Sequence, residues 1–163
     1  MLGQVERETM TSDTKSTHIS GLRFEPPAAS GPADVVRQFN TFWAAGDIDS
    51  AILLIAEHAI YALYISGDLL PFGGETAGRD SIAAVLRQIR REYEYLLYRP
   101  LDLKPNGNEV RFQVEFMYRH LRSGEVLSGR FRHIMRIEDG LIVRVDEYHD
   151  RAKVEAFMRL FGC

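Results

Sequence analysis

The alternation of apolar and polar residues through the second half of the chain constrains the fold more than any other feature. Such alternation predicts strands with one buried face, and long strands joined by short turns pair as antiparallel neighbours. Four strands are predicted, at residues 95–103, 110–120, 126–137 and 141–149. Turns are expected around residues 104–108 and Ser123-Gly124, and a tight hairpin is expected at Glu138-Asp139-Gly140.

Helical periodicity dominates the residues before these strands. Pro32 suits the first turn of a helix that Gly46 ends, and Asp47 can cap the next one. A strand at 60–65 and a loop rich in Gly and Pro at 67–78 follow. Four helices are expected, at residues 32–45, 48–55, 82–91 and 150–161. Helices followed by long antiparallel strands predict an α+β fold.

The first 29 residues are expected to form a flexible N-terminal extension. The first 30 residues contain eight Ser or Thr and no aromatic residue before Phe24. Such a segment buries too little apolar surface to offset the entropy lost on ordering. Residues 30–163 then make one domain, long enough to bury a core without disulfides or metal.

Composition argues against several classes of protein. The net charge of -3 lacks the basic excess of a general nucleic-acid binder. The single cysteine, Cys163, excludes a disulfide framework and a cysteine zinc site. No apolar run approaches the roughly 20 residues that cross a bilayer, and the polar N-terminus lacks the apolar segment of a signal peptide. A cytoplasmic protein with no nucleic-acid or membrane partner is expected.

Four short motifs carry a resemblance to a known family. They are Gly46-Asp47-Ile48-Asp49-Ser50-Ala51, Gly78-Arg79-Asp80-Ser81-Ile82, the run from His133 to Ile142, and Glu147-Tyr148-His149-Asp150. Their order and spacing resemble the SnoaL-like and ketosteroid-isomerase-like branch of the nuclear-transport-factor-2-like superfamily. The resemblance implies a cone, in which a strongly curved antiparallel (mixed) sheet wraps around three to four helices. It also implies a pocket at the open end and, commonly, a dimer.

Placing the apolar residues of each strand inward defines a predicted pocket. Its polar groups are concentrated at His133, Glu147 and His149, and the resemblance puts pocket residues at the same positions. The expected lining residues are Phe39, Trp43, Leu63, Leu86, Phe112, Val114, Phe116, Tyr118, Phe131, Met135 and Val145. A mostly apolar concavity with a few convergent polar groups is typical of a small-molecule site, so a small hydrophobic ligand is expected.

His133 and Glu147 are predicted on neighbouring strands of one hairpin and on the same face. The two Cβ atoms are about 5 Å apart if the residues are directly opposite, and about 7–8 Å apart if they are diagonal. Apolar neighbours are expected to raise the pKa of Glu147, and a nearby histidine can donate or relay a proton. The pair also resembles the acid/base pair of SnoaL-like polyketide cyclases, with Glu where they have Asp.

Two readings of these residues stay open. In the first, Glu147 is the catalytic base, His133 the acid or electrophile, and His149 an orienting group or proton relay. In the second, His133 and Glu147 only satisfy each other as buried polar groups. The three residues also form the ligand set of a metal facial triad. Because that spacing is common by chance, neither a metal nor another cofactor is expected.

The remaining polar and aromatic candidates are weaker. Solvated or turn positions are expected for the other histidines, His18, His58 and His120. Packing near the pocket mouth is expected for the tyrosines Tyr61, Tyr64, Tyr95 and Tyr98.

Two functions from different classes remain open. One is a cofactor-independent isomerase, cyclase or lyase, polyketide-cyclase-like or dehydratase-like, that removes a proton beside a carbonyl group of a small hydrophobic compound. The other is a non-catalytic domain that binds a hydrophobic ligand or forms dimers. The steroid-isomerase mechanism is not expected, because Phe39, Leu63 and His133 stand where the resemblance puts its oxyanion-hole tyrosine, catalytic aspartate and protonated aspartate.

A homodimer is expected across the convex face of the sheet. Its outward residues Met117, Ile134 and Tyr148 lie among charged residues, a mixture typical of interfaces. A pair such as Arg132 with Glu115 is expected to set the register between the two copies.

Overall fold

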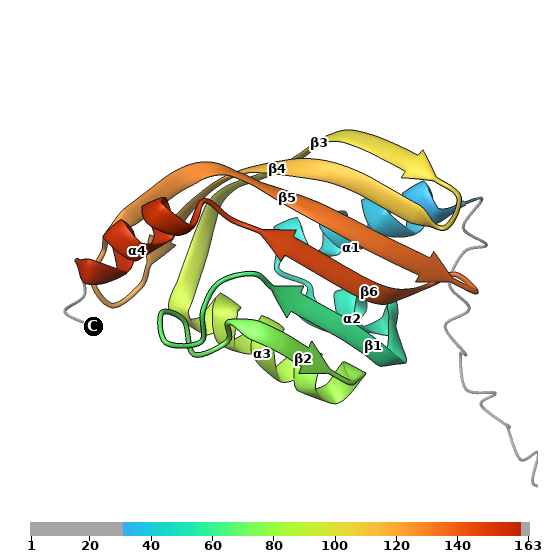
Figure 1. Cartoon of the computed structure of the whole chain (residues 1–163), viewed down its shortest axis with the longest axis horizontal. Coiled ribbons are helices and arrows are strands. Elements are labelled where there is room, and N and C mark those ends of the chain that lie inside the picture. The colour runs from blue at the N-terminus through green and yellow to red at the C-terminus, as the bar shows by residue number, and fades with distance from the viewer. Residues whose placement is uncertain (1–30, 161–163) are drawn as a thin grey trace, which may run out of the picture.

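The structure is a computed structural model and describes residues 31–160. Its elements in chain order are α1 Pro32–Ala45, α2 Ile48–Leu53, β1 Ile55–Leu63, β2 Gly74–Ala77, α3 Arg79–Glu92, β3 Tyr93–Asn106, β4 Glu109–His120, β5 Val126–Glu138, β6 Leu141–Tyr148 and α4 Arg151–Arg159 (Figure 1). The predicted α+β class with a curved, mixed sheet wrapped around helices is confirmed. The expected extension at 1–29 lies outside the described residues, as do His18 and Cys163.

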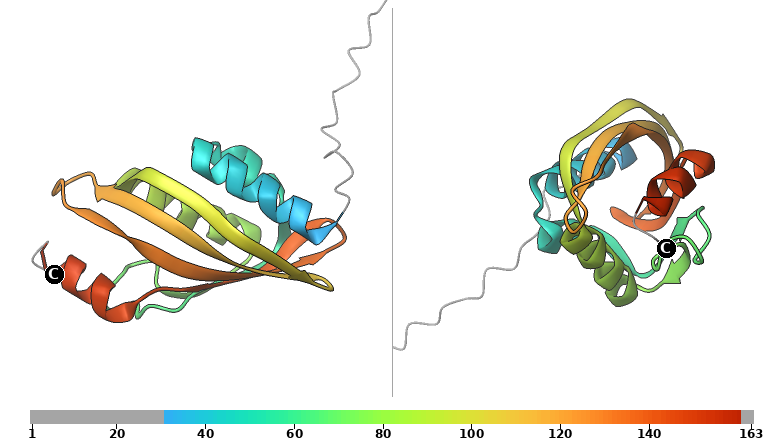
Figure 2. Two further views of the ribbon diagram at one scale, coloured as in Figure 1. Left: turned by 90° about the horizontal axis from the view of Figure 1, so that it is seen from above. Right: turned by 90° about the vertical axis from the view of Figure 1, so that its left-hand side faces the viewer.

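The six strands form one sheet in the order β2-β1-β6-β5-β4-β3. The β1–β6 pair is parallel and the other pairs are antiparallel. Pro100 and Pro105 lie in β3, which suits an edge strand because one of its sides makes no ladder hydrogen bonds. Figure 2 shows the sheet curling from β3 to β2 while α1, α2 and α3 occupy the open side. The curled sheet and these helices thus enclose the core.

Helix α1 follows the predicted pattern. Pro32 stands in its first turn, and Gly46 ends it with a φ of 76°, a left-handed conformation that glycine adopts without strain. Its apolar face is buried and points Phe39 and Trp43 toward the sheet.

No helix among residues 31–160 is both long and apolar enough to span a bilayer.

Three elements differ from the sequence predictions. Strand β3 runs to Asn106, into the segment predicted as a turn, because Lys104 and Pro105 still pair with β4. Strand β1 begins at Ile55 rather than at residue 60, because Ile55 pairs with Ile142 of β6; His58 therefore lies in a strand, where it is exposed. Strand β2 lies inside the segment predicted as a loop. Its mostly exposed residues show no apolar alternation, so only its antiparallel pairing with β1 makes it a strand.

Candidate functional site

A β-bulge aligns the two central residues of the site. Asp139 and Gly140 have φ values of 50° and 76°, so the predicted tight hairpin is confirmed. Farther from this turn the β5–β6 register slips by one residue, where β6 carries Val143 as an extra, bulged residue. His133 consequently lies directly opposite Glu147, which decides between the two registers that the sequence left open.

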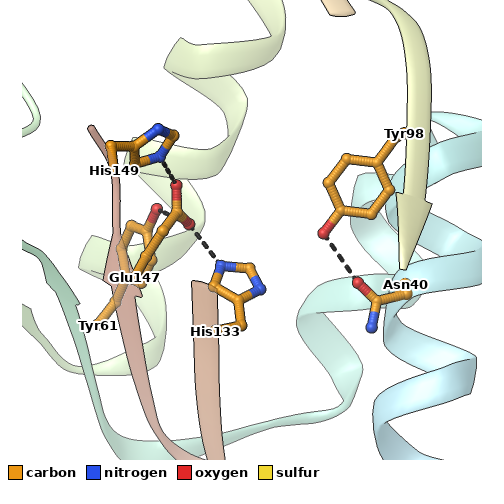
Figure 3. A network of polar contacts seen from close by, with 6 residues as sticks. All are labelled: Asn40, Tyr61, Tyr98, His133, Glu147 and His149. Atoms are coloured by element: carbon orange, nitrogen blue, oxygen red, sulfur yellow. Dashed lines mark hydrogen bonds and ion pairs between the residues drawn. The ribbon is translucent and has the colours of Figure 1, made fainter. Parts of the chain in front are cut away.

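The Glu147 carboxylate accepts hydrogen bonds from three side chains (Figure 3). Its Oε2 atom accepts from His133 Nε2 at 2.7 Å and from the Tyr61 hydroxyl at 2.9 Å. Its Oε1 atom accepts from His149 Nε2 at 2.5 Å. An ionised carboxylate only accepts hydrogen bonds, so both histidines carry a proton on Nε2. We call His133, Glu147 and His149 the carboxylate triad.

The surroundings of Glu147 act on its pKa in opposite directions. Burial raises the pKa, but the positive charge that His133 carries when it is protonated, its hydrogen bond, and the hydrogen bond and charge of His149 outweigh burial and hold it well below the ordinary value of 4.5. The raised pKa expected from the sequence is therefore wrong. That expectation counted the apolar neighbours of the carboxylate and not its donors. Glu147 is thus ionised at neutral pH.

His133 is buried with one ring nitrogen unused. The residue is 4% exposed, and its ring packs edge-on against Phe112 and Phe131 at centroid distances of 5.1 and 4.9 Å. Nδ1 is buried and has no hydrogen-bond partner within residues 31–160. Because Nε2 donates to Glu147, a neutral His133 presents an unshared electron pair at Nδ1.

Two small interior cavities, of about 40 Å³ each, share Tyr61 and Glu147 in their walls. The His133 cavity is also lined by His133, Ile55, Ile82, Ile89, Tyr95, Tyr98 and the predicted residues Phe39, Trp43, Leu86, Phe131, Met135 and Val145. The His149 cavity is lined by His149, the predicted residues Leu63 and Tyr118, and apolar residues that include Leu70, Phe72 and Val154. Phe112, Val114 and Phe116 are buried but line neither cavity.

The sequence predicted only a packing role for Tyr61 and Tyr98, but in the structure both hydroxyls donate hydrogen bonds to buried polar side chains. Tyr61 holds Glu147, and the Tyr98 hydroxyl donates to Asn40 Oδ1 at 2.8 Å. Burial, followed by the negative charge of Glu147, raises the pKa of both tyrosines, which therefore keep their protons. Two signals were available: Tyr61 shares a strand face with Leu63, and Asn40 interrupts the apolar face of α1.

Comparison with known proteins places this chain in a family, although the matched residues end before Glu147. Residues 36–145 match the model of the SnoaL-like domain. The chain belongs to the SnoaL-like family. A search of curated proteins found no match.

Solved structures are similar to the SnoaL-like chain at low sequence identity. One is a protein of unknown function with a cystatin-like fold from Xanthomonas campestris (22% identity, TM-score 0.69, covering 78% of this chain and 98% of that one). Another is a candidate polyketide cyclase from Pseudomonas putida (16% identity, TM-score 0.65, covering 78% of this chain and 97% of that one). A third, from Catenulispora acidiphila, has a ketosteroid-isomerase-like fold and is in complex with trimethylamine (14% identity, TM-score 0.64, covering 77% of this chain and 92% of that one). These likenesses show a shared fold.

The side chains of the carboxylate triad are arranged to hydrogen-bond to one another. Within the part of the chain that the structure describes, no three His, Cys, Asp or Glu residues are disposed to hold a metal ion. Both Nε2 atoms and both carboxylate oxygens of the carboxylate triad face one another in hydrogen bonds.

Acid is expected to destabilise the protein through Glu147. A carboxyl group whose pKa is lower in the folded than in the unfolded state stabilises the fold above its unfolded value, here about 4.5. That contribution is lost as the pH falls toward the folded pKa. Urea unfolding between pH 7 and pH 3 should therefore show wild-type stability falling more steeply than that of Glu147→Gln below about pH 4.5. Parallel curves for the two proteins would contradict this prediction.

Proposed function

We propose that this protein catalyses proton transfer at the carbon beside the carbonyl group of a small hydrophobic compound, with His133 as the base. The observation that carries the proposal is the buried, unpartnered Nδ1 of a histidine that borders an apolar cavity. Glu147 fixes the other nitrogen at 2.7 Å and so selects the tautomer with a free electron pair at Nδ1. A general base needs such a pair within reach of the substrate, and the cavity of about 40 Å³ must widen to admit a ketone.

The proposed roles differ from the expectation that Glu147 is the base. Both of its oxygens accept hydrogen bonds within the protein, and its lowered pKa makes it a weak base. Glu147 is better suited to orient His133 and to stabilise the imidazolium that forms when His133 takes a proton. Tyr61 assists by holding Oε2 of the same carboxylate.

Tyr98 is the proposed donor to the enolate oxygen. It lines the His133 cavity, and in the view of Figure 3 the His133 ring lies between Glu147 and the Tyr98–Asn40 pair. Its raised pKa keeps the hydroxyl protonated. The one proton, which Tyr98 donates to Asn40 Oδ1 in this structure, would turn from Asn40 to the negative oxygen that develops in the reaction.

The family relationship supports acid–base chemistry only in a general way. The Pseudomonas putida neighbour is a candidate cyclase, and the Catenulispora acidiphila neighbour holds a small organic molecule. The steroid-isomerase mechanism remains unsupported. Phe39 in the His133 cavity and Leu63 in the His149 cavity have no group that donates or accepts a proton.

The test is exchange of α-hydrogens for deuterium in D2O on a panel of small hydrophobic ketones, followed by NMR. Wild-type protein is expected to accelerate exchange above the rate in buffer with an equal concentration of free imidazole. A rate no higher than that of the imidazole control, across the panel and between pH 6 and 9, would overturn the proposed function.

A non-catalytic role is the second candidate. Both carboxylate oxygens of Glu147 accept hydrogen bonds within the protein, as in a purely structural network, and each of the two cavities has room for only a few water molecules. A hydrophobic ligand retained through purification, seen by native mass spectrometry, together with no catalysed exchange would favour this role.

A homodimer across the convex face of the sheet is also proposed. Met117 is 37% exposed there, and the Arg132 guanidinium lies 5.5 Å from the centre of the Tyr148 ring. Glu115 forms ion pairs with Arg99 and Arg130 of its own chain, which leaves the suggested Arg132–Glu115 pair less favourable than the sequence indicated.

Sedimentation at micromolar concentration is expected to show a dimer. Met117→Glu should shift it toward monomer, because the substitution buries a charge in the interface. Leu53→Glu is the matched control, since Leu53 is 55% exposed in α2, away from this face. Monomeric wild-type protein, or equal behaviour of both variants, would count against the interface.

A further inference from the structure

The carboxylate triad sets two imidazoles against one negative charge. His133 Nε2 contacts one oxygen of Glu147 and His149 Nε2 contacts the other. Groups that interact this closely titrate as a unit, so the first proton taken up by the two imidazoles opposes the second. When the two imidazoles together hold one extra proton, His133 acts as a base only if that proton resides on His149.

The surroundings of His133 disfavour a charge. A protonated Nδ1 would be an N–H donor, buried beside an apolar cavity and without an acceptor among residues 31–160. A neutral His133 leaves only an unshared electron pair at that position. The buried ring is therefore more stable in its neutral form.

The surroundings of His149 favour a charge. Its side chain is 9% exposed against 4% for His133, and it lines a pocket of about 100 Å³ whose wall includes the exposed residues Arg130, Asp150 and Lys153. Its ring lies 4.6 Å from the centre of Phe131 at an angle of 31°, an arrangement in which an aromatic face attracts a cation. Unlike His133, it has no ring nitrogen that is buried and unpartnered within the described part of the chain.

Other ionisable groups around His149 act in both directions. Asp150 favours a cation, whereas Arg130 of β5 and Lys153 of α4 oppose it. Tyr118 of β4 lines the His149 cavity and stays neutral because burial raises its pKa. The carboxylate of Glu147 is in direct contact with the ring and is therefore the strongest of these influences.

We propose that the carboxylate triad keeps its one positive charge on His149, which thereby holds His133 neutral and exchanges protons with water in the surface pocket. This inference rests on the proposed function, because it explains how the same base, His133, stays neutral and able to accept a proton at Nδ1. His149 is a positioning residue in this scheme, since it acts on the substrate only through Glu147 and His133.

Charge is conserved in the proposed series of proton transfers. The substrate C–H bond breaks, its electron pair stays on the substrate as an enolate, and the proton bonds to Nδ1 of His133. Cationic His149 then releases its Nδ1 proton to water. Both imidazoles keep their Nε2–H bonds to Glu147, so the triad has zero net charge before and after. The one net negative charge left in the site is that of the enolate, next to the protonated His133, and the proton that balances it is in the water. The steps reverse when the enolate is protonated.

Nitrogen-15 NMR of labelled histidines tests the inference without any substrate. In the wild type near neutral pH we expect His133 to be neutral with its proton on Nε2, and His149 to carry protons on both nitrogens. His149→Gln keeps an N–H donor near Glu147 but removes the cation. In this variant His133 should gain its second proton at a pH about one unit higher or more.

Tyr61→Phe is the matched control, because it removes a hydrogen bond to the same carboxylate but leaves both imidazoles. Its effect on the His133 titration should be smaller than that of His149→Gln. Equal shifts in the two variants, or none, would overturn the inference. A cationic His133 or a neutral His149 in the wild type would also overturn it, even if His149→Gln does not fold.

Deuterium exchange on the ketone panel provides a second readout. The pH at which exchange begins should rise in His149→Gln by the same amount as the His133 titration. If the wild type catalyses no exchange, the proposed function fails while the NMR result still decides the charge distribution. If exchange occurs but its onset does not move in this variant, the inference fails and the proposed function stands.

Discussion

Replacing His133 with glutamine is expected to slow α-hydrogen exchange by a factor of about 10²–10⁴, the usual contribution of a positioned base. Glutamine can still donate a hydrogen bond to Glu147 from a position close to that of Nε2. It has no basic electron pair in place of Nδ1, the atom that is buried and unpartnered in His133. The variant should therefore lose the reaction while it keeps the hydrogen bond.

His120→Gln is the control for the loss of a histidine. His120 lies at the end of β4, where its ring nitrogen contacts the Ser123 hydroxyl at 2.9 Å, and it lines neither interior cavity. Its exchange rate should equal that of the wild type. Unchanged exchange in His133→Gln would show that His133 is not the base. The base would then be Glu147 or a residue outside the carboxylate triad.

Glu147→Gln is expected to lower both stability and exchange. The carboxylate accepts from three donors, whereas the amide has one oxygen and places its NH2 group against at least one of them. Each buried donor left without an acceptor costs about 1–3 kcal/mol. Exchange should fall by a factor of about 10²–10⁴, because His133 loses the anion that orients it and stabilises its charged form.

Glu115→Gln provides a matched comparison for stability. Glu115 pairs with Arg99 and Arg130 on the outer face of the sheet, where solvent weakens such ion pairs to about 0–1 kcal/mol. Urea unfolding of both variants at pH 7 should show a clearly larger loss for Glu147→Gln. Equal losses would mean that the network around Glu147 adds little to the fold, contrary to its burial and its three donors.

The sequence predicted the face on which each site residue lies. Strict alternation on the long strands put Phe131, His133 and Met135 on the inner face of β5, where the structure also places them. It did the same for Glu147, because a two-residue period leaves only one register that buries the apolar set. The Asp139-Gly140 turn was equally predictable, since few residues adopt two successive positive φ values.

The sign of the Glu147 pKa shift was not predictable from the sequence. Apolar neighbours on the same strands indicate burial, which raises the pKa. The sign depends on the close approach of His133 and His149 to the carboxylate, at 2.7 and 2.5 Å, which outweighs burial. The Tyr61 hydroxyl, a further donor, reaches the carboxylate only because β1 pairs in parallel with β6. Strand β2, with its exposed and unpatterned residues, likewise exists only through its pairing with β1.

The amino-acid sequence by itself thus determined the fold class, the long strands, and the inward positions of His133, Glu147 and His149, because these follow from local periodicity and turn chemistry. Tertiary structure alone decided how the three side chains meet. The bulge at Val143 set the register, β1 supplied Tyr61, and the close packing of Phe112 and Phe131 left His133 Nδ1 buried without a partner. Each of these depends on contacts between residues distant in the chain, whose distances and solvation no local pattern encodes.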